Sequence, residues 1–255
     1  MSVYDEADLY AAAFDWPVDD EVDWLLATVG PVASVLEPFC GHARFAPAFV
    51  ARHVRYVGVD RSLAMLARVP RRDGVIVVAA DARDFEAPGA PFDLAWCPVN
   101  SVTHLVDEPA ALAHLVCVRR HLRTGGAYVI EIEFVNHDGP WPGAGHDKGH
   151  WSMPGPDGTT VVAAWRRISC DRAARTGLEH ARFELRSPDG TVRRVVDEQY
   201  VMRTWSWSDT QRLAAASGFA IESVHDHRAT GRLPVDPGPH LENDGVNRYV
   251  VLRAL

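Results

Sequence analysis

The spacing of hydrophobic residues predicts helices at the start of the chain. Between positions 22 and 29, apolar residues recur at i, i+3, i+4 and i+7, which is the spacing of one helix face. Residues 3–14 show a second amphipathic pattern, and Pro17 separates the two segments. Acidic residues stand at the start of the segment that contains positions 22–29, and Gly30 follows it, as expected for the start and the end of a helix. We therefore expect two helices within residues 1–30.

The spacing then changes to short apolar runs separated by helical segments. Several runs are almost continuously apolar, which is typical of strands buried on both faces. The clearest helix covers 107–122, with Asp107 as its N-cap, Pro109 in its first turn and the sequence TGG at 124–126 closing it. Strands that alternate with helices predict a parallel sheet covered on both faces. The predicted strands are 32–36, 54–59, 75–79, 92–97 and 127–133.

A different pattern occupies residues 136–205. Residues 136–158 are rich in glycine and proline and predict a loop. Three longer strand-like runs follow, and the sequence SPDG at 187–190 predicts a hairpin turn between the last two. We interpret this region as an antiparallel insertion that lies over the main sheet. The three runs are 160–169, 178–186 and 191–203.

The alternation of helix and strand returns after residue 205. Ser208 and Gln211 have the spacing of a capping box, and Gly218 follows the predicted helix. Residues 219–227 and 247–255 predict the last two strands.

These patterns predict three parts in one chain. Residues 1–30 form a helical lid, residues 31–135 and 206–255 form an α/β domain, and residues 136–205 form an inserted β cap that holds the substrate.

Composition and charge exclude some classes of function. The chain is 47% hydrophobic and carries a net charge of −8, which argues against binding of nucleic acid through its phosphates. No segment is apolar and long enough to cross a membrane, and the N-terminus has no signal-peptide pattern. The four cysteines form no C-x-x-C pair, so reduced thiols in a cytoplasmic protein are the simplest interpretation.

Acidic residues follow the predicted parallel strands, where ligands bind in open α/β sheets. Glu37 ends the first strand, and Asp60 ends the second, 23 residues later. A carboxylate at the second position can accept hydrogen bonds from both hydroxyls of a ribose. Asp81 ends the third strand, where it would meet an adenine amino group. The fourth strand leads to Cys97, Asn100, Ser101 and His104 at the same edge.

The loop after the first strand, VLEPFCGHAR, is poor in glycine. Gly41 is its only glycine, and Phe39 and Ala43 stand where a glycine-rich loop would have others. A pyrophosphate must sit on bare backbone at a helix N-terminus, so this loop disfavours a dinucleotide such as NAD. A turn that only packs, without a ligand, is the alternative for the loop taken alone.

Five segments together resemble the successive motifs of class I S-adenosylmethionine-dependent methyltransferases. The resemblance covers roughly residues 20–135 and 200–255. It implies a Rossmann-like, seven-stranded, mostly parallel sheet with S-adenosylmethionine as cofactor and S-adenosylhomocysteine as product. The family's acidic-x-Gly-x-Gly-x-Gly motif keeps only its middle glycine here. The segments are VLEPFCGHA, VGVDRSLAML, AADARDF, PFDLAWCPVNSVTHL and LRTGGAYVIEIE.

The resemblance also implies roles for individual residues. Asp60 would bind the ribose, Asp81 and Ala82 the adenine edge, and Glu37 would offer negative charge to the cofactor's ammonium group. Tyr4, Tyr10 and Trp16 would belong to a lid over the cofactor, unless they only pack. The remaining predicted cofactor-binding residues are Pro38, Cys40, Gly41, Arg61, Met65, Cys97 and Asn100.

The implied reaction is an in-line displacement of the cofactor's methyl group by a nitrogen, oxygen or carbon atom of the substrate. An oxygen or carbon nucleophile benefits from a general base, for which His104, Glu133 and His137 are the candidates. A hydrogen-bonded structural histidine is the competing interpretation of His104. The other histidines lack the helical spacing of a metal site, so we expect no metal.

The tryptophans of the insertion suggest the kind of substrate. Aromatic walls with a few polar groups suit a small organic molecule, for example one of specialised metabolism. The alternative is that the same tryptophans simply form a core. They are Trp141, Trp151 and Trp165, followed by Trp205 and Trp207. No nucleic-acid or membrane partner is expected, and a homodimer stays open. The alternatives are an NAD-dependent oxidoreductase, a catalytically silent binding subunit and an enzyme that uses the cofactor for other chemistry.

Overall fold

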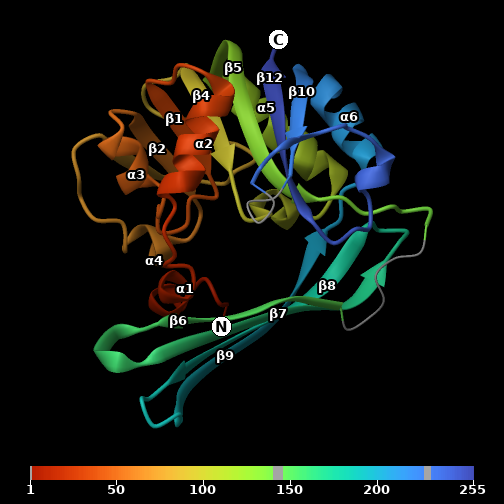
Figure 1. Cartoon of the computed structure of the whole chain (residues 1–255). Coiled ribbons are helices and arrows are strands. Elements are labelled where there is room, and N and C mark those ends of the chain that lie inside the picture. The colour runs from red at the N-terminus through yellow and green to blue at the C-terminus, as the bar shows by residue number, and fades with distance from the viewer. Residues whose placement is uncertain (1, 140–145, 227–230) are drawn as a thin grey trace.

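The computed structural model describes residues 2–139, 146–226 and 231–255. Its main body is an eight-stranded sheet in the order β11-β10-β12-β5-β4-β1-β2-β3 (Figure 1). The strands β1 to β5 pair in parallel, whereas β10, β11 and β12 run antiparallel to their neighbours. The bounds are β1 Ser34–Pro38, β2 Arg55–Asp60, β3 Val75–Ala79, β4 Phe92–Cys97, β5 Leu122–Glu133, β10 Phe219–His225, β11 Pro234–Val235 and β12 Asn247–Ala254.

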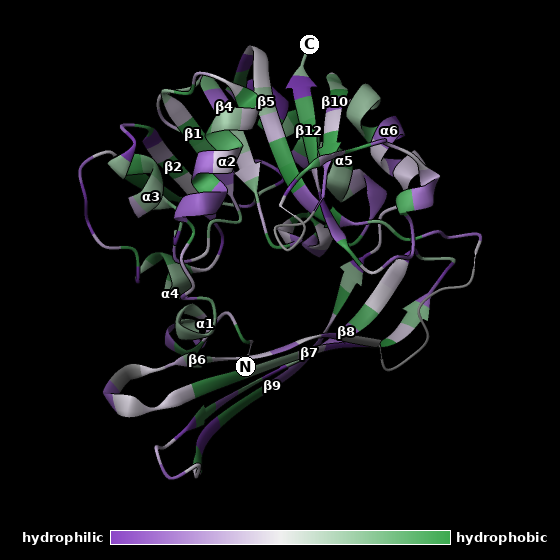
Figure 2. Cartoon of the chain, in the orientation of Figure 1, coloured by the Kyte–Doolittle hydropathy of each residue, from purple (hydrophilic) through white to green (hydrophobic). Residues whose placement is uncertain are grey.

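Helices cover both faces of this sheet, as the alternating pattern predicts. One apolar core lies between the sheet and the side of α5 and α6, and a second lies on the side of α2 and α3. Figure 2 shows the hydrophobic residues that run along the central strands. The helices are α1 Ala7–Ala13, α2 Asp19–Val29, α3 Ala46–Ala51, α4 Leu63–Leu66, α5 Glu108–His121 and α6 Trp207–Ala216, with short 3-10 turns η1 Ser101–His104, η2 Pro156–Gly158 and η4 Pro239–Leu241.

A second sheet of four antiparallel strands lies across from the first (Figure 1). The chain enters it after β5 and returns to the main body at Trp205, which pairs with Phe134 where the two sheets meet. A third apolar cluster joins α1 to the inner face of this sheet through Leu9, Phe14 and Phe183. Its strands are β6 His146–Pro154, β7 Thr160–Asp171, β8 Thr176–Arg186 and β9 Val192–Arg203, in that order.

The structure confirms the fold class and corrects several local predictions. The sequence 136–158, predicted as a loop, contains β6, because pairing with β7 outweighs the low strand propensity of its glycines and prolines. The TGG at 124–126 lies inside β5 and does not close α5. The central sheet has eight strands and not seven, because the two-residue β11 adds an edge.

Helix boundaries differ at two places. The first helix is shorter than 3–14, since residues 3–5 form a turn in front of α1. The N-cap of α6 is Ser206, whose hydroxyl accepts the N–H of Asp209, and not Ser208. The N-cap of α5 is Asp107, as predicted, and its carboxylate accepts the N–H of Ala110. The predicted turn at 187–190 is confirmed by the bond from the N–H of Gly190 to the carbonyl of Ser187.

Candidate active site

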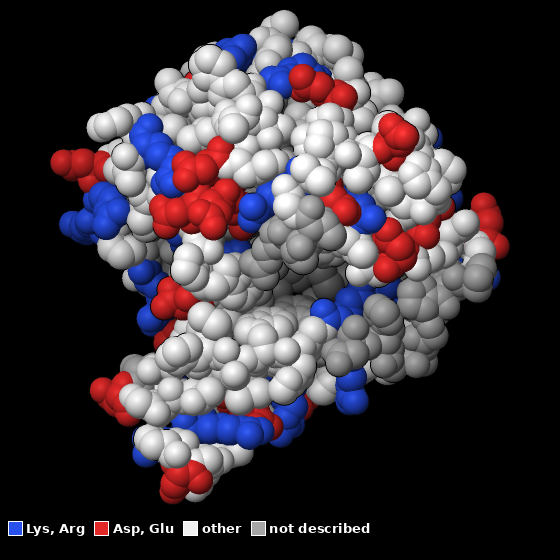
Figure 3. Space-filling model, in the orientation of Figure 1, with Lys and Arg blue, Asp and Glu red and all other residues white. Residues whose placement is uncertain are grey.

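A cavity of about 1760 Å³ separates the two sheets at the carboxyl ends of the parallel strands. Figure 3 shows the molecule hollowed between its upper and lower parts. Ligand pockets for one drug-sized molecule occupy about 300–1,000 Å³, so this cavity has room for two such ligands.

The glycine-poor loop keeps a glycine-like backbone. Phe39, Gly41 and Ala43 all have positive φ, of 60°, 55° and 53°. These are the three positions that glycines hold in the motif the loop resembles. A side chain in this region costs about 1–2 kcal/mol, so Phe39 and Ala43 are strained. The loop therefore has a left-handed backbone at all three of these positions, although two of them are not glycine.

Asp60 holds this loop in place. One carboxylate oxygen accepts the N–H of Gly41 at 2.8 Å, and the other accepts the N–H of Ser62 at 2.8 Å. Each oxygen of an ionised carboxylate has two lone pairs, so each can still accept a hydroxyl. Asp60 is thus oriented by backbone and lines the cavity.

Glu37 and Cys40 lie beneath the loop and not on the described lining of the cavity. Glu37 is buried, and its carboxylate accepts the Tyr56 hydroxyl at 2.7 Å. Burial raises the pKa of Glu37 to about 8, so the neutral form dominates at pH 7. Cys40 packs against Gly58, where a Cβ would approach its sulfur to 2.7 Å. The predicted negative charge of Glu37 is therefore largely absent in this structure.

The adenine-side candidates lie next to a buried histidine. Asp81 and Ala82 line the cavity, and Arg83 forms an ion pair with Asp81 that lowers the pKa of this carboxyl to about 2. His114 from α5 donates its Nδ1 hydrogen to the carbonyl of Ala82 at 2.7 Å. Its Nε2 lies 2.7 Å from the Tyr128 hydroxyl.

The turn after β4 is strained and held by a carboxylate. Val99 and Asn100 are both left-handed, with φ of 58° and 55°, which is unusual for a β-branched residue. Glu131 on β5 accepts the N–H of Val99 at 2.6 Å and the side-chain amide of Asn247 at 2.8 Å. The Asn100 side chain accepts the N–H of Glu133 at 2.9 Å. This turn directs η1, and with it His104, to the cavity.

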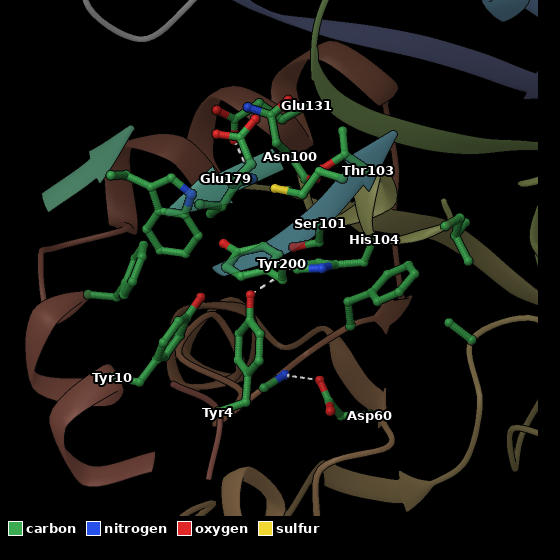
Figure 4. Close-up of a pocket in the computed structure, with 18 of the residues that line it drawn as sticks. Tyr4, Tyr10, Asp60, Asn100, Ser101, Thr103, His104, Glu131, Glu179 and Tyr200 are labelled. Atoms are coloured by element: carbon green, nitrogen blue, oxygen red, sulfur yellow. Dashed lines mark hydrogen bonds between the residues drawn. The ribbon is translucent and has the colours of Figure 1, made fainter. Parts of the chain in front are cut away.

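His104 contacts the N-terminal segment. Its Nε2 lies 2.8 Å from the Tyr4 hydroxyl (Figure 4). Burial, with a smaller effect of Arg61, lowers the pKa of His104 to about 4, so the imidazole is neutral at pH 7. His104 is therefore a hydrogen-bonded neutral histidine that also lines the cavity.

Aromatic side chains from three parts of the chain form a closed ring that includes this histidine. Neighbouring centroids lie between 5.3 and 6.0 Å apart. The ring joins the N-terminal segment, η1 and the inner face of the second sheet. Its members, in order, are Tyr4, Tyr10, Phe183, Trp165, Tyr200 and His104.

The other two catalytic candidates differ in position. Glu133 lines the cavity and forms an ion pair with Lys148, the only lysine of the chain, which comes from β6. His137 is not on the lining that the described residues form; its Nε2 lies 3.0 Å from the Thr204 hydroxyl and its Nδ1 3.7 Å from Asp209. The structure therefore brings His104 and Glu133 to the cavity but not His137.

Most of the predicted cofactor residues meet at this cavity. Those on the described lining are Tyr10, Gly41, Asp60, Arg61, Met65, Asp81, Ala82 and Asn100. Those off it are Glu37, Pro38, Cys40 and Cys97, all of which are buried. Burial also raises the pKa of the Cys97 thiol to about 12. Successive side chains near the end of a strand point alternately to the cavity and to the core. The spacing of residues in the sequence does not say which of them point to the cavity.

Several charged residues of the lining were missed by sequence reasoning, and two of them, Arg44 and Glu21, lie near the glycine-poor loop. Arg44 follows the loop, donates to the carbonyl of Phe14 at 3.1 Å and lies 4.5 Å from the Trp16 ring centroid. Glu21 on α2 is buried and accepts the Tyr249 hydroxyl at 2.9 Å. An arginine directly after the loop was the available signal for the first, whereas Glu21 looks like an ordinary first-turn acid of a helix.

The tryptophans divide between cavity and core. Trp151 and Trp165 line the cavity, and the Trp151 indole donates to the carbonyl of Ala13 at 2.7 Å. Trp205 and Trp207 belong to the apolar core under the main sheet. Trp141 lies outside the described residues.

Other sequence predictions concern metals and membranes. Among the described residues, no group of histidine, cysteine, aspartate and glutamate is placed to hold a metal ion. His227, one of the histidines for which no metal site was expected, lies outside the described residues. In the described ranges, no helix has the length and hydropathy needed to cross a membrane.

Comparison with known proteins agrees with this geometry. Residues 35–126 match a family model described as a methyltransferase domain. The amino pentose methyltransferase CalS10 from Micromonospora echinaspora, involved in calicheamicin biosynthesis, is 22% identical over 100% of this chain and 98% of its own, with a TM-score of 0.70.

Two further solved structures show the same fold. The sugar N-methyltransferase KedS8 from Streptoalloteichus is 22% identical over 97% of this chain and 92% of its own, with a TM-score of 0.71. The CcbJ methyltransferase from Streptomyces caelestis is 17% identical over 98% of both chains, with a TM-score of 0.70. A search of curated proteins found no match. The chain thus contains a methyltransferase domain at residues 35–126, and it shares the fold of these solved methyltransferases.

Proposed function

We propose that this enzyme transfers the methyl group of S-adenosylmethionine to an amine nitrogen of a small organic molecule. One observation carries the proposal. The cavity is lined by Asp60 and Asp81, the two carboxylates predicted to bind the cofactor, at the ends of β2 and β3. It is also lined by aromatic side chains of the second sheet. Both partners of a transfer reaction would thus share one enclosed space.

The main sheet would hold the cofactor, whose sulfonium supplies an already activated methyl group. Asp60 would accept the ribose hydroxyls, and Asp81 with Ala82 would bind the adenine edge. The amino-acid end carries a carboxylate and an ammonium group, for which Arg44 and Glu21 are the charged partners on the lining. These two residues replace Glu37 in our assignment, because Glu37 is covered by the loop.

The second sheet would hold the methyl acceptor. Tyr4, Tyr200 and Trp165 supply aromatic rings to the lining, and aromatic rings attract cationic groups such as the ammonium product of amine methylation. The solved relatives support an amine, since their names give a sugar N-methyltransferase and an amino pentose methyltransferase. The attack is a displacement in which alignment and exclusion of water do most of the work.

A strong general base is not needed for this reaction. A neutral amine attacks with its own lone pair, and the product loses a proton afterwards. His104 stays the first candidate to receive that proton, directly or through Tyr4, and Glu133 the second. His137 is better explained as a structural partner of Thr204.

The division into a lid of residues 1–30, a cofactor domain and a β cap fits the contacts of the N-terminal segment. The N–H of Val3 and the hydroxyl of Ser2 donate to Glu198 of β9, at 2.7 and 3.0 Å. The lid would therefore cover one opening of the cavity by contacting both the β cap and the cofactor domain. A cytoplasmic location and a homodimer stay predictions, the first supported by the free cysteines.

Calorimetry and a methylation screen test the proposal. We expect S-adenosylhomocysteine to bind and NAD not to bind. With methyl-labelled S-adenosylmethionine, a panel of amines, alcohols and phenols should yield labelled N-methyl product from the amines. Firm cofactor binding with transfer only to oxygen or carbon would reject the amine, and tight NAD binding without S-adenosylhomocysteine binding would reject the function.

A further inference from the structure

Phe39 occupies a backbone position that suits glycine. Its φ of 60° lies in the left-handed region, where any side chain is strained. A phenylalanine in a strained backbone conformation suggests that its side chain has a function. We propose that the Phe39 ring forms one wall of the adenine slot of the cavity and packs against the adenine of the cofactor. This inference rests on the proposed function.

The Phe39 ring is placed between core and cavity. It packs against the core cluster on the α5 side and against the His114 ring, with centroids 5.2 Å apart. It is only partly buried and lines the cavity. One part of the ring is therefore anchored, and another part is available to a ligand.

The surroundings of the ring match a flat heteroaromatic group. The cavity lining at the ends of β2 and β3 and before α5 has a row of apolar residues, with Asp81 at its edge, while other charged residues, Asp60, Arg61, Arg83 and Asp107, also line this part of the cavity. Adenine needs apolar faces and a hydrogen-bond partner for its amino group. The ribose and the amino-acid end need several polar partners instead, which Asp60 and Arg44 supply elsewhere. The apolar residues of the slot are Val59, Ala80, Ala82, Leu105, Val106 and Ala110.

His114 couples the ring to the backbone at the edge of the slot. A carbonyl only accepts hydrogen bonds, so Nδ1 of His114 carries the hydrogen that the Ala82 carbonyl accepts. Burial lowers the pKa of His114 to about 4, so the imidazole is neutral and its Nε2 accepts from the Tyr128 hydroxyl. The Phe39 wall and the Ala82 edge are thus held by the same buried side chain, in a fixed relation to one another.

Ala43 provides a matched control for the strain. It has the same left-handed conformation, with φ of 53°, but it is buried in the other core and does not line the described cavity. Ala43→Gly removes strain without removing a ligand contact. Phe39→Ala removes the ring and leaves a side chain at the strained position.

Calorimetric titration with S-adenosylhomocysteine and with adenosine tests the inference. We expect Phe39→Ala to weaken both ligands by the same factor, about 5- to 150-fold, because stacking on an aromatic side chain is lost from the part they share. The affinities of Phe39→Leu, which keeps apolar volume, should lie between those of the wild-type protein and those of Phe39→Ala. Ala43→Gly should leave both affinities unchanged and raise the melting temperature.

An NMR readout is independent of affinity. The adenine H2 and H8 signals of bound S-adenosylhomocysteine should move upfield in the wild-type protein and less in Phe39→Leu, because the ring current is lost. If Phe39→Ala does not fold, the comparison rests on Phe39→Leu. Unchanged affinities and unchanged shifts in a folded Phe39 variant would overturn this inference alone. A wild-type protein that does not bind S-adenosylhomocysteine would overturn the proposed function with it.

Discussion

The two walls of the cavity are built by different means. The wall from the main sheet relies on backbone: three left-handed residues in one loop, and Asp60 bonded to two N–H groups. The wall from the second sheet relies on side chains that alternate along pleated strands. Its apolar end, with Ala163 and Phe183, packs on the N-terminal helix, and its polar end carries the buried ion pair of Arg167 and Glu179.

This difference suggests a division of labour. A wall made of backbone changes little when side chains change, so it suits a ligand that does not vary. A wall made of side chains on a regular sheet can be altered one position at a time. We therefore expect substitutions of cavity-lining residues of the wall from the main sheet, such as Asp60 and Phe39, to affect cofactor binding, and substitutions of cavity-lining residues of the second sheet to affect the methyl acceptor.

The largest expected effect is at Asp60. Asp60→Ala removes the acceptor of two backbone N–H groups and the proposed ribose contacts, each worth about 1.5–3 kcal/mol for a charged partner. We expect S-adenosylhomocysteine to bind at least ~100-fold more weakly in calorimetry. Asp236→Ala, which removes an exposed charge, is the control. A folded Asp60→Ala protein with wild-type affinity would contradict the assignment of this wall.

The next effect concerns stability and pH. Glu37 has a folded-state pKa of about 8 against 4.5 for the ordinary group, so the folded state holds its proton more tightly. Its contribution to stability is full below pH 4.5 and is lost as pH rises towards 8. Glu37→Gln keeps an acceptor for Tyr56, so at pH 8 it should be more stable than wild type by about 2–4 kcal/mol, with little difference near pH 4.5.

Denaturant unfolding at the two pH values measures this difference. Because Glu37 does not line the described cavity, the same variant should keep its affinity for S-adenosylhomocysteine. Equal stability of both proteins at pH 8 would contradict the raised pKa of Glu37, and a large loss of affinity would place Glu37 at the cofactor after all.

A change on the second sheet should spare the cofactor. Trp165→Leu removes ring contacts with Phe183 and Tyr200, each worth about 0.5–1.5 kcal/mol. With an amine found in the screen, we expect KM for the acceptor to rise about tenfold and the affinity for S-adenosylhomocysteine to stay the same. Val192→Ala, at an exposed site on the same sheet, is the control. Equal losses for both ligands would remove the distinction between the two walls.

The smallest expected effect is at the lid. Tyr4→Phe removes the hydroxyl that meets His104 and keeps the ring. A single neutral hydrogen bond contributes about 0.5–1.5 kcal/mol, so kcat should fall about 2- to 10-fold. Steady-state kinetics against His104→Gln would show whether the two changes act on one step. Additive losses in the double variant would separate Tyr4 from His104.

The sequence predicted the wall made of backbone better than the wall made of side chains. Asp60 and Asp81 follow strands whose apolar runs are unmistakable, so their place at the sheet edge could be inferred. The backbone conformation of the loop at 39–43 could not be predicted, since phenylalanine and alanine rarely adopt the left-handed conformation that glycine would have indicated.

The second sheet shows the limit of the pattern. Its strands were expected, but β6 lies in a segment whose glycines and prolines predict a loop, and its pairing with β7 is long-range. Without the pairing register of these strands, the sequence pattern cannot predict the contact of Lys148 with Glu133 or of Trp165 with Tyr200. Arg44 and Glu21 were missed for a related reason, because their cavity-facing positions depend on how the N-terminal segment folds over the loop.

A crystal structure with bound S-adenosylhomocysteine tests the central claim most directly. We predict that the ribose hydroxyls meet Asp60, that the adenine lies on Phe39 beside Ala82, and that the sulfur faces the space bounded by Tyr4, His104 and Tyr200. A cofactor bound outside this cavity, or bound in it without contact to Asp60, would contradict the account.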